Sequence, residues 1–244
     1  MSNDLIEKLF KVGAHYGLSS SRRHPSSRPF LFGSKGGTEL FDLEKTSAFL
    51  TEALEFIAKL AKDRKVVLFV GGKAEAREEV KRTAESLNQP YAAARWIGGS
   101  LTNWAEIKKR LNRLQEITDQ TKSGELAKFT KLERLMIERE ATDLTTMFGG
   151  LVGLTKLPDA LVVVDPRAQA GAVAEANALN IPVVALLNSD CDASTIEYPI
   201  PANDASKATI EYVLAQIAEA YRDNLGAVPT APTAAAAPVV PEVR

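Results

Sequence analysis

The stretch ALVVV, residues 160–164, decides the fold of this 244-residue chain. Five consecutive apolar residues, three of them valine, are typical of a strand that is buried on both faces. Two further runs have the same character, VVLFV at residues 66–70 and VVALL at residues 183–187. Each run precedes a turn and then a helix or loop, which is the rhythm of a parallel sheet with helices on both sides. The sequence therefore predicts an α/β fold.

The segments around these runs complete the predicted sheet domain. IEYPI at residues 196–200 is expected to be an edge strand, because Pro199 cannot donate to a central ladder. YAAAR at residues 91–95 is expected to be another short strand. A small N-terminal strand pair is expected from PFLF at residues 29–32 and TELFDL at residues 38–43. Helices are expected, from apolar periodicity and capping residues, over residues 43–62, 74–87, 168–179 and 204–224, the last one capped by Asp204.

Residues 104–148 form the exception, because no strand-like run interrupts them. Apolar residues recur at spacings of three and four in two short pieces, which start at Trp104 and at Ile137. Gly124 lies between the pieces and offers a reversal. We predict two long antiparallel helices that protrude from the sheet domain as a helical hairpin. The alternative is a pair of ordinary surface helices packed on the core.

Composition places the chain among globular proteins and leaves one charge asymmetry to explain. No apolar run approaches the roughly 18 residues of a membrane span, no signal peptide is recognised, and one cysteine excludes a disulfide framework, so a cytoplasmic location is expected. Residues 1–37 carry six Lys/Arg against two Asp/Glu, while residues 150–244 carry five against eleven. We expect residues 1–226 to form one domain and the Ala/Pro-rich residues 227–244 a flexible tail.

Enzymatic chemistry finds little support in the motifs. VGGK at residues 70–73 follows a strand and opens a helix, but it lacks the first glycine and the Ser/Thr of a phosphate-binding P-loop. A tight turn is the favoured interpretation. Asp165 ends a strand, where carboxylates of α/β enzymes lie, yet an Asp before a proline is equally a turn signal. Nothing in the sequence gathers around it, and neither a catalytic centre, a metal site nor a cofactor site is predicted.

The segment WIGGSLTNW, residues 96–104, joins the sheet-forming half to the helical stretch. It holds both tryptophans of the chain, a Gly-Gly pair and Asn103, with Arg95 before it and Lys108–Arg110 after it. Aromatic faces, flexible backbone and adjacent cations suit a surface that binds RNA. The alternative for both tryptophans is core packing, and Trp104 in addition falls on the predicted helical seam.

Several long motifs, in order, resemble the bacterial type of ribosomal small-subunit protein two. The resemblance covers nearly all of residues 5–225. It rests on KVGAHYG (11–17), RPFLFG (28–33), FDLEKT (41–46), LFVGGK (68–73), RWIGGSLTNW (95–104), LPDALVVVD (157–165), EANALNIPVVAL (175–186), NSD (188–190) and IPANDAS (200–206). The chain departs from the family pattern at Leu18, where family members often have a second histidine, and at Arg23-His24-Pro25, where they often have an aromatic-Asn-Pro segment.

The resemblance implies a non-enzymatic structural constituent of the small ribosomal subunit. The implied fold is a Rossmann-like (flavodoxin-like) parallel sheet flanked by helices, with an inserted, protruding antiparallel coiled-coil hairpin. The implied position is the solvent side of the subunit, where head and body meet. The implied partners are small-subunit ribosomal RNA and other small-subunit proteins, including the large multi-domain messenger-binding protein. The resemblance also implies that the protein joins the subunit late in assembly and takes part in translation.

Two basic patches are the candidate RNA-binding residues. The N-terminal patch consists of Arg22, Arg23, Arg28 and Lys35. The second patch consists of Arg95, Trp96, Asn103, Lys108, Lys109 and Arg110. Two other hypotheses remain at this point: an α/β enzyme that uses the VGGK turn and Asp165, and a protein–protein adaptor that uses the helical hairpin or the acidic C-terminal third.

Overall fold

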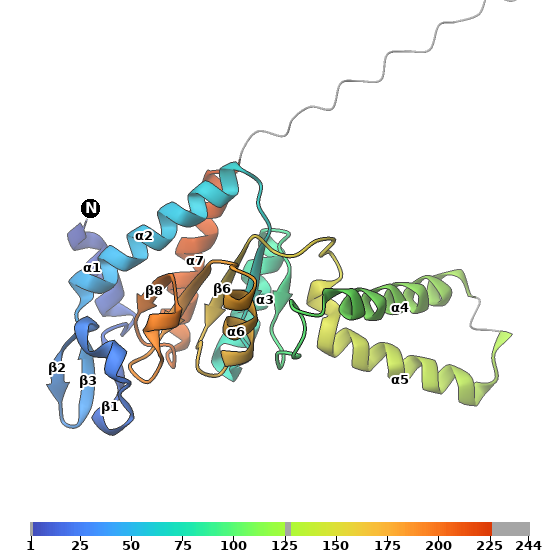
Figure 1. Ribbon diagram of the computed structural model, residues 1–244, viewed down its shortest axis with the longest axis horizontal. Helices are drawn as coiled ribbons and strands as arrows, with labels where there is room; N and C mark the ends of the chain where they lie inside the picture. Colours follow the sequence, from blue (N-terminus) through green and yellow to red (C-terminus); the bar gives the residue numbers. More distant parts are fainter. Residues whose placement is uncertain (1, 125–127, 226–244) are drawn as a thin grey trace, which may run out of the picture.

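The computed structural model describes residues 2–124 and 128–225, and its centre is a five-stranded parallel sheet (Figure 1). The strands are β4 (Val67–Val70), β5 (Tyr91–Ala92), β6 (Ala160–Val164), β7 (Val183–Leu187) and β8 (Tyr198–Pro201). Their spatial order is β5-β4-β6-β7-β8, and all four pairings are parallel. Counted within the sheet, this is the order of flavodoxin-like doubly wound folds. The three buried runs and the edge strand predicted from the sequence are confirmed.

Helices cover both faces of the sheet because alternate strand residues point to opposite sides. One face, with Phe69, Val162 and Val184, packs against four helices, α1 (Ser2–Lys11), α2 (Leu43–Lys62), α3 (Ala74–Ser86) and α7 (Lys207–Asp223). The other face, with Leu68 and Val163, packs against α6 (Ala170–Ala178) and against the segment that carries α4 and α5. Strands buried on both faces explain why their sequences are continuous apolar runs.

A second, antiparallel sheet precedes α2. It consists of β1 (Tyr16–Ser19), β3 (Thr38–Phe41) and β2 (Leu31–Lys35), in that spatial order. The predicted N-terminal strand pair is therefore confirmed as β2 and β3, and β1 was not predicted. Two short 3₁₀ helices, η1 (Ser20–Arg22) and η2 (Pro25–Phe30), connect β1 to β2. Hydrogen bonds from Leu18 N to Ser189 Oγ (3.0 Å) and from His24 N to Ser189 O (2.8 Å) fix this segment to the end of β7.

The helices α4 (Trp104–Ser123) and α5 (Lys131–Phe148) lie side by side and extend away from the sheets (Figure 1). Gly124 follows the last residue of α4, and its left-handed φ of 74° suits glycine. α5 begins with a capping box between Thr130 and Glu133. Along α4 the buried side chains follow the predicted spacing, Ile107, Leu111, Leu114 and Ile117. α5 buries only Leu144 and Phe148, near the sheet domain, before the 3₁₀ helix η4 (Gly149–Leu151).

The predicted cap of the last helix was wrong. α7 begins at Lys207, and its cap is Ser206, whose hydroxyl accepts a hydrogen bond from Thr209 N at 3.4 Å. Asp204 turns instead toward the carboxyl end of the sheet, where its carboxylate meets Lys73. A 3₁₀ helix, η5 (Ala193–Thr195), lies between β7 and β8. The expected tail, residues 227–244, lies outside the described residues.

Candidate nucleic-acid interface

A charged cluster lies at the carboxyl edge of the parallel sheet. Lys73 follows β4, Asp165 follows β6 and Asp204 follows β8. The Lys73 Nζ is 3.2 Å from Asp165 Oδ2 and 3.4 Å from Asp204 Oδ1. The expectation that nothing gathers around Asp165 was wrong, because its partners come from distant turns that only the sheet brings together. Asp165 Oδ1 also accepts a hydrogen bond from Ala168 N at 3.0 Å, and Asp165 itself has a positive φ of 61°. The interpretation of Asp165 as a turn residue therefore holds as well.

Burial controls the electrostatics of this cluster. Asp204 is 2% exposed and accepts a hydrogen bond from Asn188 Nδ2 at 2.7 Å. Burial raises the pKa of Asp204 to about 6, against the opposing effects of the Asn188 hydrogen bond and of Lys73. Burial alone would lower the pKa of Lys73, but attraction to Asp204 and Asp165 outweighs it and the pKa is raised. Lys73 is therefore a charged, internally paired cation at neutral pH.

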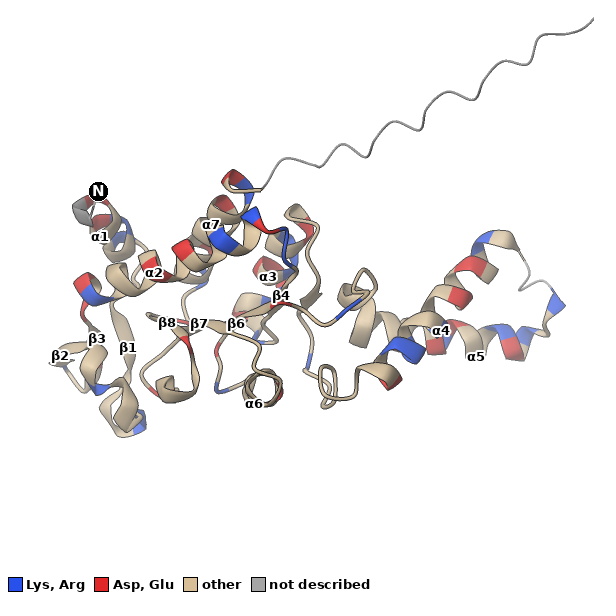
Figure 2. Ribbon diagram, turned by 45° about the horizontal axis from the view of Figure 1, so that its top comes forward, with Lys and Arg blue, Asp and Glu red and all other residues tan. Residues whose placement is uncertain are grey.

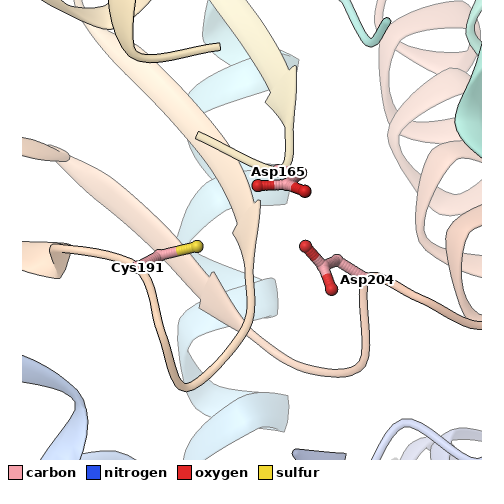
Figure 3. Close-up of side chains that lie close together, drawn as sticks. All are labelled: Asp165, Cys191 and Asp204. Atoms are coloured by element: carbon pink, nitrogen blue, oxygen red, sulfur yellow. The ribbon is translucent and has the colours of Figure 1, made fainter. Parts of the chain in front are cut away.

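Three potential metal ligands meet at the same edge, Asp165, Cys191 and Asp204 (Figure 3). Their ligand atoms lie within 4.8 Å of one another. The Lys73 ammonium, however, already contacts both carboxylates. Burial also raises the pKa of the Cys191 thiol to about 12, and metal binding requires the thiolate. The donor set therefore fits an internal ion pair better than a metal centre, and it leaves the VGGK lysine engaged by carboxylates.

The glycines of the VGGK segment make a close turn between strand and helix. A Cβ on Gly71 would lie 2.7 Å from Val80 Cγ2, and one on Gly72 would lie 2.6 Å from Ala94 O. Both distances are shorter than atomic contacts allow, so the turn requires glycine at both positions. This packing supports the interpretation of VGGK as a tight turn.

One carboxylate, Glu175 on α6, holds the loop that sequence reasoning singled out. Its Oε1 accepts from Trp96 Nε1 (3.0 Å) and Gly99 N (2.8 Å). Its Oε2 accepts from Leu101 N (2.9 Å), Thr102 N (3.1 Å) and the Thr102 hydroxyl (3.2 Å). Burial would raise the pKa of Glu175, but the hydrogen bonds outweigh burial and the pKa is lowered. Sequence reasoning missed Glu175, since its partners lie more than 70 residues away.

This clamp decides how the two tryptophans are placed. Trp96 is partly buried, with its indole N–H on Glu175 and its ring edge beside Gly171, where a Cβ would lie 3.3 Å from Trp96 Cδ1. Trp104 opens α4 and is also partly buried against the core. Asn103 is the residue before α4, and its side chain makes no capping hydrogen bond. The loop therefore docks on α6 and directs the start of α4.

The N-terminal patch lies on the segment between β1 and β3. Arg22, Arg28 and Lys35 are exposed. Arg23 differs, because its Nη1 lies 3.1 Å from Oε1 of Glu39, a side chain that is only 3% exposed. Arg23 therefore compensates a buried charge within the fold, whereas the other three cations of the patch make no ion pair in the part of the chain that the structure describes.

The second patch lies at the base of the α4–α5 pair. Arg95, Lys108, Lys109 and Arg110 are all exposed, and Lys109 pairs with Glu106 at 2.6 Å. Cations and carboxylates alternate along both helices (Figure 2), for example in the pair between Arg113 Nη2 and Glu140 Oε2 at 3.0 Å. Exposed cations therefore lie at the base of the α4–α5 pair, and others, such as Lys122 and Arg139, lie farther along the two helices. None of the described helices combines the length and the apolar content needed to cross a bilayer.

Comparison with known proteins assigns the family. The family model described as ribosomal protein S2 matches residues 9–224. A small ribosomal subunit protein uS2 from Roseiflexus sp. is 42% identical over 215 residues, which cover 88% of this chain and 82% of the relative. Proteins with the same name from Chloroflexus aggregans and Helicobacter hepaticus are 38% and 39% identical over 90% of this chain and over 92% and 83% of their own lengths.

These relatives are structural ribosomal proteins and not enzymes, in agreement with the expectation from the sequence. The matched residues include the parallel sheet, the clamp at Glu175 and both α4 and α5. The chain therefore belongs to the ribosomal protein S2 family.

Proposed function

We propose that this chain is a structural constituent of the small ribosomal subunit, where it binds small-subunit ribosomal RNA and contributes to assembly and translation. The observation that carries the proposal is the family match over residues 9–224, together with relatives that are named small ribosomal subunit proteins. The proposed location is the ribosome in the cytoplasm. The internal pairing of Lys73 supports a structural role for the carboxyl edge of the sheet, because the cation is held by carboxylates.

The RNA contacts in this proposal are mostly to phosphates. Arg22, Arg28 and Lys35 on one surface, and Arg95 and Arg110 on the other, are exposed cations that can reach a polyanion. We assign smaller roles to the other members of the patches, since Arg23 and Lys109 are paired with carboxylates and Trp96 is docked on Glu175. Lys108 and Asn103 flank the start of α4 and complete the second surface.

The α4–α5 pair would act as a coiled-coil hairpin inserted into one α/β domain of residues 1–226. The spacing of Ile107, Leu111 and Leu114 and their burial support this proposal. A rigid projection with charged outer faces would let one protein reach RNA at a distance from its sheet domain. Docking of the large multi-domain messenger-binding protein is the further partner that we propose, on the basis of family membership.

Sedimentation tests the proposal directly. The full chain, expressed in bacteria, should comigrate with the small subunit on a sucrose gradient at moderate salt. Replacing Arg22, Arg28 and Arg110 together by glutamine should release it at lower salt, because the lost phosphate contacts weaken binding. The slope of log affinity against log salt should also fall in magnitude by about 0.7–0.9 for each lost contact. The matched control replaces three exposed cations on other helices, Lys59, Lys62 and Arg222.

Two results would count against this proposal. Wild-type protein that stays at the top of the gradient would overturn the ribosomal function. Equal salt sensitivity of the patch variant and the control variant would overturn the assignment of the RNA contacts to these two surfaces.

A further inference from the structure

A groove of about 840 Å³ lies between α4 and α5, beside the seam that joins the two helices. Buried apolar residues of both helices line it, Ile107, Leu144 and Phe148. Four exposed residues of α5 also line it, Met136, Arg139, Asp143 and Met147. Their spacings of three and four residues place these four side chains on one face of the helix. α5 therefore carries an outer stripe beside the stripe that packs on α4.

The two methionines of the outer stripe leave apolar surface uncovered. Met136 is 62% exposed and Met147 is 47% exposed. Single apolar side chains on a surface are ordinary, but these two line one groove that has buried apolar residues beneath it. Exposed apolar side chains that gather beside charged ones mark interaction surfaces, and flexible methionines are common where helices dock. The stripe therefore has the chemistry of a docking surface for a helix.

The two charged residues of the outer stripe restrict what can dock there. Arg139 and Asp143 are exposed, and neither makes an ion pair within residues 2–124 and 128–225. A cation four residues before an anion is the less favourable order for pairing within a helix. The other carboxylates of the groove, Glu106 and Glu140, already pair with cations of α4. An occupant must therefore offer both an anion and a cation, and a polyanion such as RNA offers only one of them.

The order of the residues makes the outer stripe complementary to itself. In an antiparallel pair of α5 helices centred on Ala141, Arg139 of each copy lies opposite Asp143 of the other. Met136 then lies within one residue of Met147 of the second copy. A two-fold symmetric interface requires this property, because residue i must contact residue j on both sides of the axis.

We propose that the chain forms a two-fold symmetric dimer through the outer stripe, with α5 of each copy packed antiparallel on α5 of the other. The dimer covers the four methionines and forms two Arg139–Asp143 ion pairs. The two α4–α5 pairs together make a four-helix bundle. Because the contact is limited to one pair of helices, its dissociation constant is about micromolar or weaker. The dimer concerns the chain outside the ribosome and does not depend on RNA binding.

Sedimentation velocity of the full chain at increasing concentrations tests the dimer. The wild type should shift from one chain mass toward two as the concentration rises through the micromolar range. Arg139→Asp and Asp143→Arg should each weaken the dimer about 3- to 30-fold, because each removes two exposed ion pairs and adds repulsion between like charges. The double variant Met136→Gln/Met147→Gln should also weaken it, because the apolar contact is lost.

Restored pairing separates a specific contact from a general effect of charge. The double variant Arg139→Asp/Asp143→Arg exchanges the two charges and should associate as the wild type does. An equimolar mixture of the two single variants should associate in the same way. Glu138→Lys, which changes an exposed residue of α5 outside the groove, is the matched control and should leave the dimer unchanged. Urea unfolding of every variant checks the fold.

Each remaining outcome overturns the proposal. A wild type that stays monomeric at about 0.5 mM would exclude the dimer. Equal association of Arg139→Asp and wild type would place the contact on another surface, and a monomeric exchanged variant would refute the pairing of Arg139 with Asp143. If the wild type is monomeric and Met136→Gln/Met147→Gln no longer comigrates with the small subunit, the stripe belongs to a ribosomal partner instead. Comigration of the wild type is measured separately, so the proposed function stands even if the dimer fails.

Discussion

Replacement of Glu175 by glutamine should loosen the loop that connects the sheet to α4. The carboxylate accepts five hydrogen bonds from Trp96, Gly99, Leu101 and Thr102, three of them from main-chain N–H groups. Glutamine keeps one oxygen and turns an NH₂ group toward the other donors. If that oxygen stays with Trp96 and Gly99, the N–H groups of Leu101 and Thr102 lose their partner.

The expected magnitude follows from those two bonds. Hydrogen bonds to a charged group contribute about 1.5–3 kcal/mol each, so their full loss would cost about 3–6 kcal/mol. Thr102 is exposed, and water can replace part of what its N–H group loses. We therefore expect Glu175→Gln to lower the free energy of unfolding by about 2–3 kcal/mol at pH 7.

The pH dependence gives a second readout. The folded pKa of Glu175 lies below its ordinary value of 4.5, because the hydrogen bonds outweigh the effect of burial. The carboxylate therefore stabilises the fold fully above pH 4.5, and this stabilisation is lost as the pH falls through the folded pKa. The difference between wild type and Glu175→Gln should accordingly shrink below pH 4.5.

Urea unfolding, followed by circular dichroism and tryptophan emission, measures both effects. The control is Glu138→Gln on α5, where an exposed glutamate makes no side-chain hydrogen bond within the described residues. A Glu175→Gln variant within about 0.5 kcal/mol of wild type, as expected for ordinary surface changes, would refute the clamp. A deficit that stayed constant from pH 7 to pH 3.5 would refute its electrostatic origin.

Three further predictions concern the sheet and its carboxyl edge. The pKa of Asp204 rises from 3.8 to about 6 on folding, so the native state binds this proton more tightly than the unfolded state. The free energy of unfolding should therefore fall by about 1–3 kcal/mol as the pH rises from 4 to 6. In urea unfolding, Asp204→Asn should abolish this pH dependence. Gly150→Ala should cost about 1–3 kcal/mol, because a Cβ would overlap the carbonyl and ring of Tyr91, whereas Gly98→Ala meets nothing within 4 Å and should unfold at nearly the wild-type urea concentration. The Cys191 thiol, 1% exposed and with its pKa raised by burial to about 12, should react with a thiol reagent at pH 8 only on unfolding; rapid labelling of the folded chain would contradict its burial.

Local sequence patterns were sufficient to predict most of the helices and strands. β6 and β7 coincide with the predicted runs, and α2 has the predicted bounds, because each is decided by consecutive apolar residues or by helical periodicity. β1 was missed because YGLS has no run of apolar residues, and its pairing with β3 depends on tertiary contacts. The prediction that Asp204 caps α7 was wrong for the same reason, because its role depends on tertiary contacts. In the sequence alone, an aspartate that caps a helix cannot be distinguished from one that pairs with a distant lysine.

The candidate site was less predictable than the fold. Glu175 and Asp204 act through partners that lie in other parts of the sequence, and no spacing rule connects them. The exposed cations at Arg22 and Arg110 could be identified from local charge alone, and their role as RNA contacts stays a prediction. The pairing of Arg23 with Glu39 became visible only when β1 and β3 were placed together.

Because α4 is long, a small change in its direction where the preceding loop docks on α6 produces a large displacement at its far end. Twenty residues span about 30 Å, so a rotation of about 5° at Trp104 would displace the far end of the helix by about 3 Å. That displacement is comparable to the whole length of a hydrogen bond. The position that the far end of α4 offers to a partner therefore depends on the angle between α4 and the sheet domain, which is fixed about 30 Å away. The Glu175 carboxylate, which holds the loop before α4, helps to fix that angle.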